Sequence, residues 1–158
     1  MGHWEEGLRG DFWLRVGVSL LCGFIVGAER QVRGKPVGIR TSILICLGTM
    51  TYVQLAQLPG NTSEHTARVL GQIISGIGFL GGGVILTQGG LVFGVTSAAV
   101  VWMLAAIGAA IGLDHYGVAF FTCIIAVGVL LGVEKLETAM KGLRKGVHAP
   151  VSSKIMSD

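Results

Sequence analysis

Charged residues are scarce in this 158-residue sequence, and their absence from long stretches is its most informative feature. Only 13% of the residues are Asp, Glu, Lys or Arg, whereas 51% are hydrophobic and the mean hydropathy is +0.70. An ordinary soluble domain carries about 25% charged residues, so this composition excludes the usual soluble classes. None of the four charged residue types occurs in residues 41–63, 69–113 or 115–133.

Cysteine is also rare, and no group of residues suited to catalysis or metal binding is visible. Cys22, Cys46 and Cys123 lie within apolar runs and lack metal-ligand spacing, so we expect them to be small buried side chains. The four histidines lack such spacing too, and the Gly-rich segment is not closed by the Gly-Lys-Ser/Thr of a phosphate loop. We therefore expect no enzymatic activity, no cofactor, no metal and no nucleic-acid partner.

The charge-free runs predict an all-α membrane protein, a five-transmembrane-helix bundle. A hydrocarbon core about 30 Å thick requires about 20 consecutive apolar residues in a helix. We take residues 1–134 as the transmembrane domain and residues 135–158 as a short basic cytoplasmic tail. The five predicted spans are 12–28, 41–58, 69–88, 95–113 and 117–133.

Basic residues are unevenly shared between the two sides of the predicted bundle. Nine of the 12 Lys and Arg residues fall in the first loop (residues 29–40) and in the tail, which five spans place on one side. Arg9, Arg15 and Arg68 fall on the other side. The positive-inside rule makes the richer side cytoplasmic, so we predict an outside N-terminus and an inside C-terminus.

Glycine is abundant, with 26 residues, and small residues recur four positions apart in the predicted spans. Such spacing lets membrane helices approach closely, and it occurs at Gly23/Gly27, Gly71/Ser75, Gly78/Gly82 and Gly108/Gly112. The third span contains more glycine than any other predicted span. Either it is broken or thinned, exposing backbone groups to a cavity or ligand, or it lies against several neighbours. The residues concerned are Ser75, Gly76, Gly78, Gly81, Gly82 and Gly83.

Two polar clusters are expected at the ends of the bundle. The inner one comprises Glu29, Arg30, Arg40, Thr41, Thr96 and Ser97. It forms either a pocket for an anion, lipid headgroup or acidic partner, or an ion pair of Glu29 with Arg30 or Arg40 that anchors the first two helices. The outer one, which we expect to bridge helices by hydrogen bonds, comprises Gln54, Gln57, Arg68 and Gln72.

Four ordered motifs across roughly residues 15–135 resemble the MgtC/SapB family of bacterial inner-membrane proteins. They are GAERQ at 27–31, VGIRT at 37–41, Arg68 followed by GQIISGIGFLGGGVI at 71–85, and GVTSAA at 94–99 followed by Trp102. The resemblance implies a multi-pass inner-membrane protein with five transmembrane helices, connected with magnesium homeostasis. About two dozen residues follow the last predicted span, so we expect a short form without the ACT-like C-terminal domain of some members.

Two functions from different classes follow from this resemblance. The first is a non-enzymatic regulator that binds another membrane complex, such as the ATP synthase or one that handles ions. The alternative is a small oligomeric transporter or channel for magnesium or another ion. Magnesium favours carboxylate and water ligands, and no Asp or Glu lies deep in a predicted span, which favours the regulator. Besides the lipid bilayer, we expect a homo-oligomeric partner.

Overall fold

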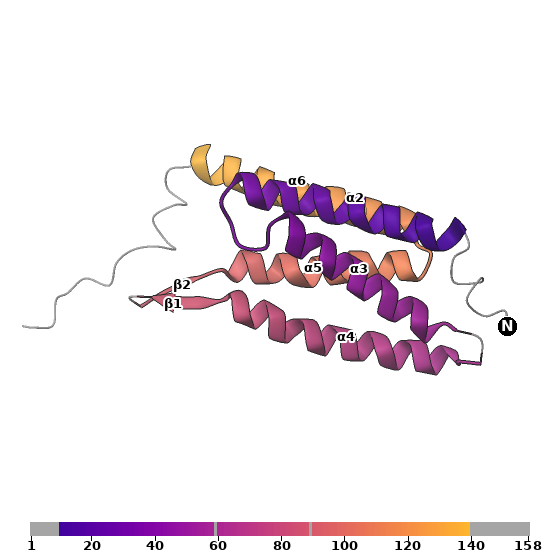
Figure 1. Cartoon of the computed structure of the whole chain (residues 1–158). Coiled ribbons are helices and arrows are strands. Elements are labelled where there is room, and N and C mark those ends of the chain that lie inside the picture. The colour runs from indigo at the N-terminus through magenta and orange to yellow at the C-terminus, as the bar shows by residue number, and fades with distance from the viewer. Residues whose placement is uncertain (1–9, 59, 89, 140–158) are drawn as a thin grey trace, which may run out of the picture. The chain divides into compact units, whose positions relative to one another are not determined.

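The structure is a computed structural model that describes residues 10–58, 60–88 and 90–139 (Figure 1). These residues contain five helices long and apolar enough to cross a membrane, as the charge-free runs predict. The helices are α2 (Gly10–Val32), α3 (Ile39–Ala56), α4 (Ser63–Val84), α5 (Val95–Gly112) and α6 (Tyr116–Ala139). A short antiparallel hairpin of β1 (Leu86–Gln88) and β2 (Leu91–Phe93) joins α4 to α5.

The connections alternate between the two ends of the bundle. Figure 1 shows the α2–α3 loop and the β1–β2 hairpin at one end, and the α3–α4 and α5–α6 connections at the other. This alternation brings the end of α2 and the start of α5 to one level, as the predicted topology requires. A two-stranded hairpin has open edges that hydrocarbon does not tolerate, so we expect β1 and β2 at the membrane surface.

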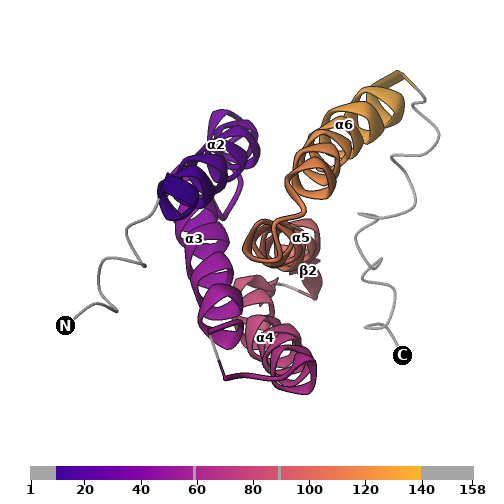
Figure 2. The ribbon, with the colours of Figure 1, turned by 90° about the vertical axis from the view of Figure 1, so that its right-hand side faces the viewer.

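Helix α3 is held between α2 and α5 by glycines on both neighbours (Figure 2). A Cβ built on Gly23 or Gly27 of α2 would lie 2.7 or 2.6 Å from a backbone Cα of α3. On α5, a Cβ at Gly108 would lie 2.6 Å from the Cys46 carbonyl oxygen, and Gly112 is equally crowded. The small-residue spacing predicted for the first and fourth spans therefore marks real helix contacts.

The core of the bundle is aliphatic. Met50, Leu104, Ile107 and Ile111 are fully buried on α3 and α5. The cysteines are all free and fully buried, which confirms their interpretation as small apolar side chains.

The third predicted span, residues 69–88, is wrong at both ends. Helix α4 begins at Ser63, where the Thr62 side chain accepts a hydrogen bond from the His65 N–H, and it ends at Val84. Residues Leu86–Gln88 belong to β1 instead. The turn into α5 requires Gly94, which has φ +87°, and a Cβ there would collide with the Val84 carbonyl oxygen.

The Gly-rich segment is not broken, because α4 is continuous through it, and α4 is the least buried span of the first compact unit. Gly81 is the one buried residue of α4, and it contacts Ala98 of α5. The remaining glycines of α4 meet no protein atom of the described residues within 4 Å of an added Cβ. They are Gly71, Gly76, Gly78, Gly82 and Gly83.

Helix α6 spans the boundary between two compact units, residues 1–127 and 128–158. In the first unit, Ala119 and Cys123 are buried, and the Cys123 thiol lies 3.6 Å from the Cys22 carbonyl oxygen of α2. In the second, the described residues continue α6 to Ala139. Helix α6 thus extends into the predicted tail as far as Ala139, and residues 140–158 lie outside the described ranges.

Candidate functional site

The end of the bundle that carries the α2–α3 loop buries two charged side chains. Glu29 and Arg30 lie in the last two turns of α2, and their side chains are only 6% and 4% exposed. Gly27, one turn earlier, lets α2 lie directly against the start of α3. The Gln31 side chain reinforces this contact by accepting a hydrogen bond from the Ile39 N–H. Burial of Glu29 and Arg30 therefore follows from close packing just before the loop.

These two side chains take part in three polar contacts, one of which reaches α5. Arg30 Nη2 donates a hydrogen bond of 2.7 Å to Ser97 Oγ. Glu29 Oε1 lies 2.8 Å from Arg33 Nε, and Glu29 Oε2 lies 3.9 Å from Arg30 Nη1. One carboxylate thus faces two guanidinium groups, leaving the cluster with one excess positive charge.

The cluster retains unused hydrogen-bonding capacity. Both carboxylate oxygens of Glu29 and Nε of Arg30 are buried without a well-aligned hydrogen bond to any described residue. The 2.8 Å contact with Arg33 is therefore an ionic contact rather than an aligned hydrogen bond. Buried polar atoms without partners ordinarily hold water or another polar group, and buried charges are costly unless they are fully paired. The geometry therefore suits a buried structural pair whose polar atoms are only partly satisfied by the described residues.

The other predicted members of the inner cluster lie apart from it. Arg40, Thr41 and Thr96 are exposed, and Arg40 has no ion pair with any described residue. The predicted pairing of Glu29 with Arg40 is thus absent from the structure. Sequence analysis missed Arg33, although its i,i+4 spacing from Glu29 on a helix is a recognised signal for an ion pair.

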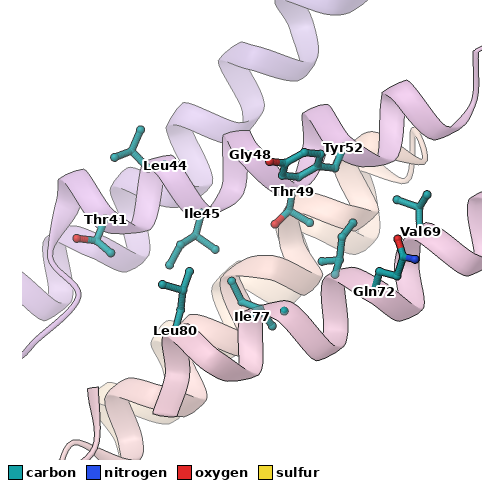
Figure 3. A pocket seen from close by; sticks show the side chains of 12 residues that line it. Thr41, Leu44, Ile45, Gly48, Thr49, Tyr52, Val69, Gln72, Ile77 and Leu80 are labelled. Atoms are coloured by element: carbon teal, nitrogen blue, oxygen red, sulfur yellow. The ribbon is translucent and has the colours of Figure 1, made fainter. Parts of the chain in front are cut away.

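A second feature lies between α3 and α4, where a cavity of about 580 Å³ opens along both helices (Figure 3). Its volume falls within the range of about 300–1,000 Å³ typical of ligand pockets. Most lining side chains are aliphatic, and Gly48 and Gly76 expose backbone to it. We call this cavity the α3–α4 groove. Its lining residues are Thr41, Leu44, Ile45, Gly48, Thr49, Tyr52, Val69, Gln72, Ile73, Gly76, Ile77 and Leu80.

The predicted outer cluster is not assembled as one group. Gln54 is half-buried, Arg68 and Gln72 are exposed, and none of them bonds to another residue in the described ranges. Gln57 does bridge two helices, because its Nε2 donates hydrogen bonds to the Gly112 carbonyl at 2.7 Å and to its own helix. Gln72 lines the α3–α4 groove instead.

An ion pair that sequence analysis missed fastens the outer end. Arg15 Nε and Nη2 donate hydrogen bonds to the two Asp114 carboxylate oxygens at 2.8 and 2.9 Å. The Tyr116 hydroxyl donates a further one at 2.8 Å. The hydrogen bonds from Arg15 and then Tyr116 hold the pKa of Asp114 below its usual value. This contact ties α2 to the turn between α5 and α6.

Among the described residues, no three or more His, Cys, Asp or Glu side chains gather in a way that suits a metal ion. The acidic side chains that the structure describes in the first unit lie near helix ends or in the α5–α6 turn, at Asp11, Glu29, Glu64 and Asp114. No described carboxylate there occupies the middle of a span.

Comparisons with known proteins agree on one family. A profile of the MgtC family matches residues 16–139. Protein MgtC of Brucella abortus (strain 2308) is 40% identical over 137 residues, which cover 84% of this chain and 56% of that protein. Protein MgtC of Salmonella typhimurium (strain LT2) is 36% identical over 121 residues, covering 77% and 52%. Protein SapB of Bacillus subtilis is 33% identical over 144 residues, covering 83% and 59%.

The chain thus spans little more than half the length of these curated relatives. No solved structure is a significant match.

Proposed function

The chain belongs to the MgtC family, and from that membership we propose that it is a non-enzymatic regulator that binds another membrane protein complex. The observation that carries this proposal is the bare side of α4. Gly71, Ser75, Gly78 and Gly82 follow one another at spacings of four, three and four residues, which places them on one face of the helix. We call these four residues the bare α4 face.

Elsewhere in this chain, similar faces of small residues lie against a neighbouring helix. Gly23 and Gly27 on α2, and Gly108 on α5, use the same kind of spacing to bring backbones into contact with α3. Close van der Waals packing of this kind drives association of membrane helices, since lipid tails are as apolar as leucine. A helix with an equally small face and almost no burial is suited to a partner helix from outside the chain.

Two further features support a binding role over ion conduction. The carboxylates described in the first unit lie at helix ends or in a turn, whereas magnesium sites favour carboxylates with several waters. Glu29 and Arg30 are buried and contact each other, and Arg30 also donates a hydrogen bond to Ser97 of α5, which supports a role in packing α2 against α5. We propose an ion-handling complex of the bacterial inner membrane as the partner, with the ATP synthase as the first candidate to test, on the strength of the family resemblance.

The experiment compares the parent chain with Gly78→Leu/Gly82→Leu, which fills the bare α4 face. Gly83→Leu is the matched control, because Gly83 is equally open and belongs neither to the bare α4 face nor to the α3–α4 groove. Each tagged protein is purified from its native membrane under mild conditions, and the co-purifying complex is quantified by mass spectrometry. We expect the double variant to lose at least tenfold in recovered partner, equivalent to about 1.4 kcal/mol, and the control to retain it.

The same purified proteins are then reconstituted into liposomes for ion-flux measurements. The proposal expects flux no greater than that of empty liposomes. Selective magnesium or other ion flux from the purified chain would instead establish the transporter alternative. If the parent and the double variant recovered equal amounts of the partner, the bare α4 face would not be the surface that binds it.

A further inference from the structure

The α3–α4 groove has the length of one membrane leaflet. On α3 it runs from Thr41 to Tyr52, a separation that corresponds to about 16 Å at 1.5 Å per residue. The hydrocarbon core is about 30 Å thick, so one leaflet contributes about 15 Å. Figure 3 shows Thr41 and Leu80 toward one end, and Tyr52, Val69 and Gln72 toward the other. The groove therefore starts near the first turn of α3 and extends past the middle of both helices.

The surface end of the groove is positively charged. Arg40 is exposed and lies one turn before Leu44, a lining residue, on the same side of α3. It has no ion pair among the described residues, and Lys35 is exposed in the preceding loop. Residues 41–63 and 69–113 contain no Asp or Glu, so neither wall supplies a carboxylate to neutralise Arg40. The N-terminus of α3 adds a partial positive charge.

We propose that the α3–α4 groove binds one acyl chain of an anionic phospholipid, whose headgroup pairs with Arg40. The aliphatic walls formed by Leu44, Ile77 and Leu80 suit a hydrocarbon chain. The unpaired cation at the mouth favours an anionic headgroup over a zwitterionic one. This inference does not depend on the regulatory role proposed above.

The groove and the bare α4 face can be altered separately. Gly48 and Gly76 line the groove from opposite helices, and a Cβ at either meets no protein atom within 4 Å. A larger side chain at either position therefore starts in open space and extends into the groove. Gly82 is just as open but lies on the bare α4 face, which makes Gly82→Leu a matched control.

The test measures lipid retained by the purified full-length chain, using native mass spectrometry of protein released from detergent micelles. The probes are phosphatidylglycerol and phosphatidylcholine with identical acyl chains. We expect the parent to retain one phosphatidylglycerol with about fivefold preference, the ratio that one surface arginine supports. Gly48→Leu/Gly76→Leu should retain neither lipid above background, whereas Gly82→Leu should behave as the parent. Arg40→Gln should retain both lipids equally.

Soluble glycerol phosphate separates a lipid site from a simple anion site. We expect a large excess of it to leave the retained phosphatidylglycerol in place, because it lacks the chain that fills the groove. Displacement of the lipid by glycerol phosphate would overturn the proposal. So would unchanged retention by Gly48→Leu/Gly76→Leu, an unchanged headgroup preference in Arg40→Gln, or a protein dimer that this double variant dissociates in the absence of lipid.

Discussion

Replacing Gly27 with alanine tests how α2 and α3 are held together. The added Cβ would lie 2.6 Å from the Ile39 Cα and 2.9 Å from its nitrogen, whereas carbon atoms in contact are about 3.5–4.0 Å apart. One helix must therefore move by about 1 Å. Such overpacking costs about 1–3 kcal/mol, and Glu29 and Arg30, one turn further along α2, would be displaced with it.

Gly78→Ala provides the matched control, because Gly78 also lies inside a membrane-spanning helix but has nothing within 4 Å of an added Cβ. Both substitutions gain the same intrinsic helix propensity, about 1 kcal/mol in water. Their difference in unfolding free energy thus isolates the steric term. Unfolding is followed by circular dichroism during titration of mixed micelles with sodium dodecyl sulfate. We expect Gly27→Ala to be less stable by about 1–3 kcal/mol, and equal stability would refute the packing argument.

Three other contacts give predictions of their own. Ser97→Ala removes the acceptor of the buried Arg30 hydrogen bond, so unfolding free energy should fall by about 1–3 kcal/mol, whereas Ser97→Thr should retain most of it. The pKa of Asp114 in the folded protein lies below that of an unfolded aspartate, about 3.9. The ion pair with Arg15 therefore contributes stability above about pH 3.9, and this contribution is lost as the pH falls through the lower pKa of the folded protein. Thermal unfolding at pH 7 and pH 3 should therefore show a smaller acid-induced loss in Asp114→Asn than in the parent, and equal losses would contradict the role of the pair. Gln57→Leu breaks a bridge between α3 and α5 and should lower stability by about 0.5–1.5 kcal/mol in the same titration, and unchanged stability would contradict this role of the bridge.

The membrane-spanning helices could be predicted because charge is expensive in hydrocarbon, and charge-free runs therefore mark the spans. The same signal misplaced the third helix. Glu64 and Arg68 suggested that residues before 69 lie outside it, yet Thr62 caps a helix that starts at Ser63. The hairpin after α4 was missed because residues 69–88 carry no charge and therefore predict one span, although two short runs separated by Gly89-Gly90 are typical of a β-hairpin.

Glycine spacing predicted where close packing is feasible but not where it occurs. The pairs Gly23/Gly27 and Gly78/Gly82 have the same spacing, and only the first lies against another helix of the chain. The contact of Arg30 with Ser97 joins residues far apart in sequence, so it depends on how α2 and α5 pack. The α3–α4 groove likewise depends on the separation of two helices, which no local pattern encodes.

Photocrosslinking from the side of α4 tests the central claim most directly. Phe79 is 84% exposed and lies one turn from Ser75 and from Gly82, so Phe79→p-benzoylphenylalanine places a probe of similar shape beside the bare α4 face. Phe121 on α6, 67% exposed, receives the same probe as the control. On illumination of the native membrane, the account predicts that the probe at residue 79 captures the co-purifying complex and that the probe at residue 121 does not. Capture of lipid alone from position 79 would contradict it.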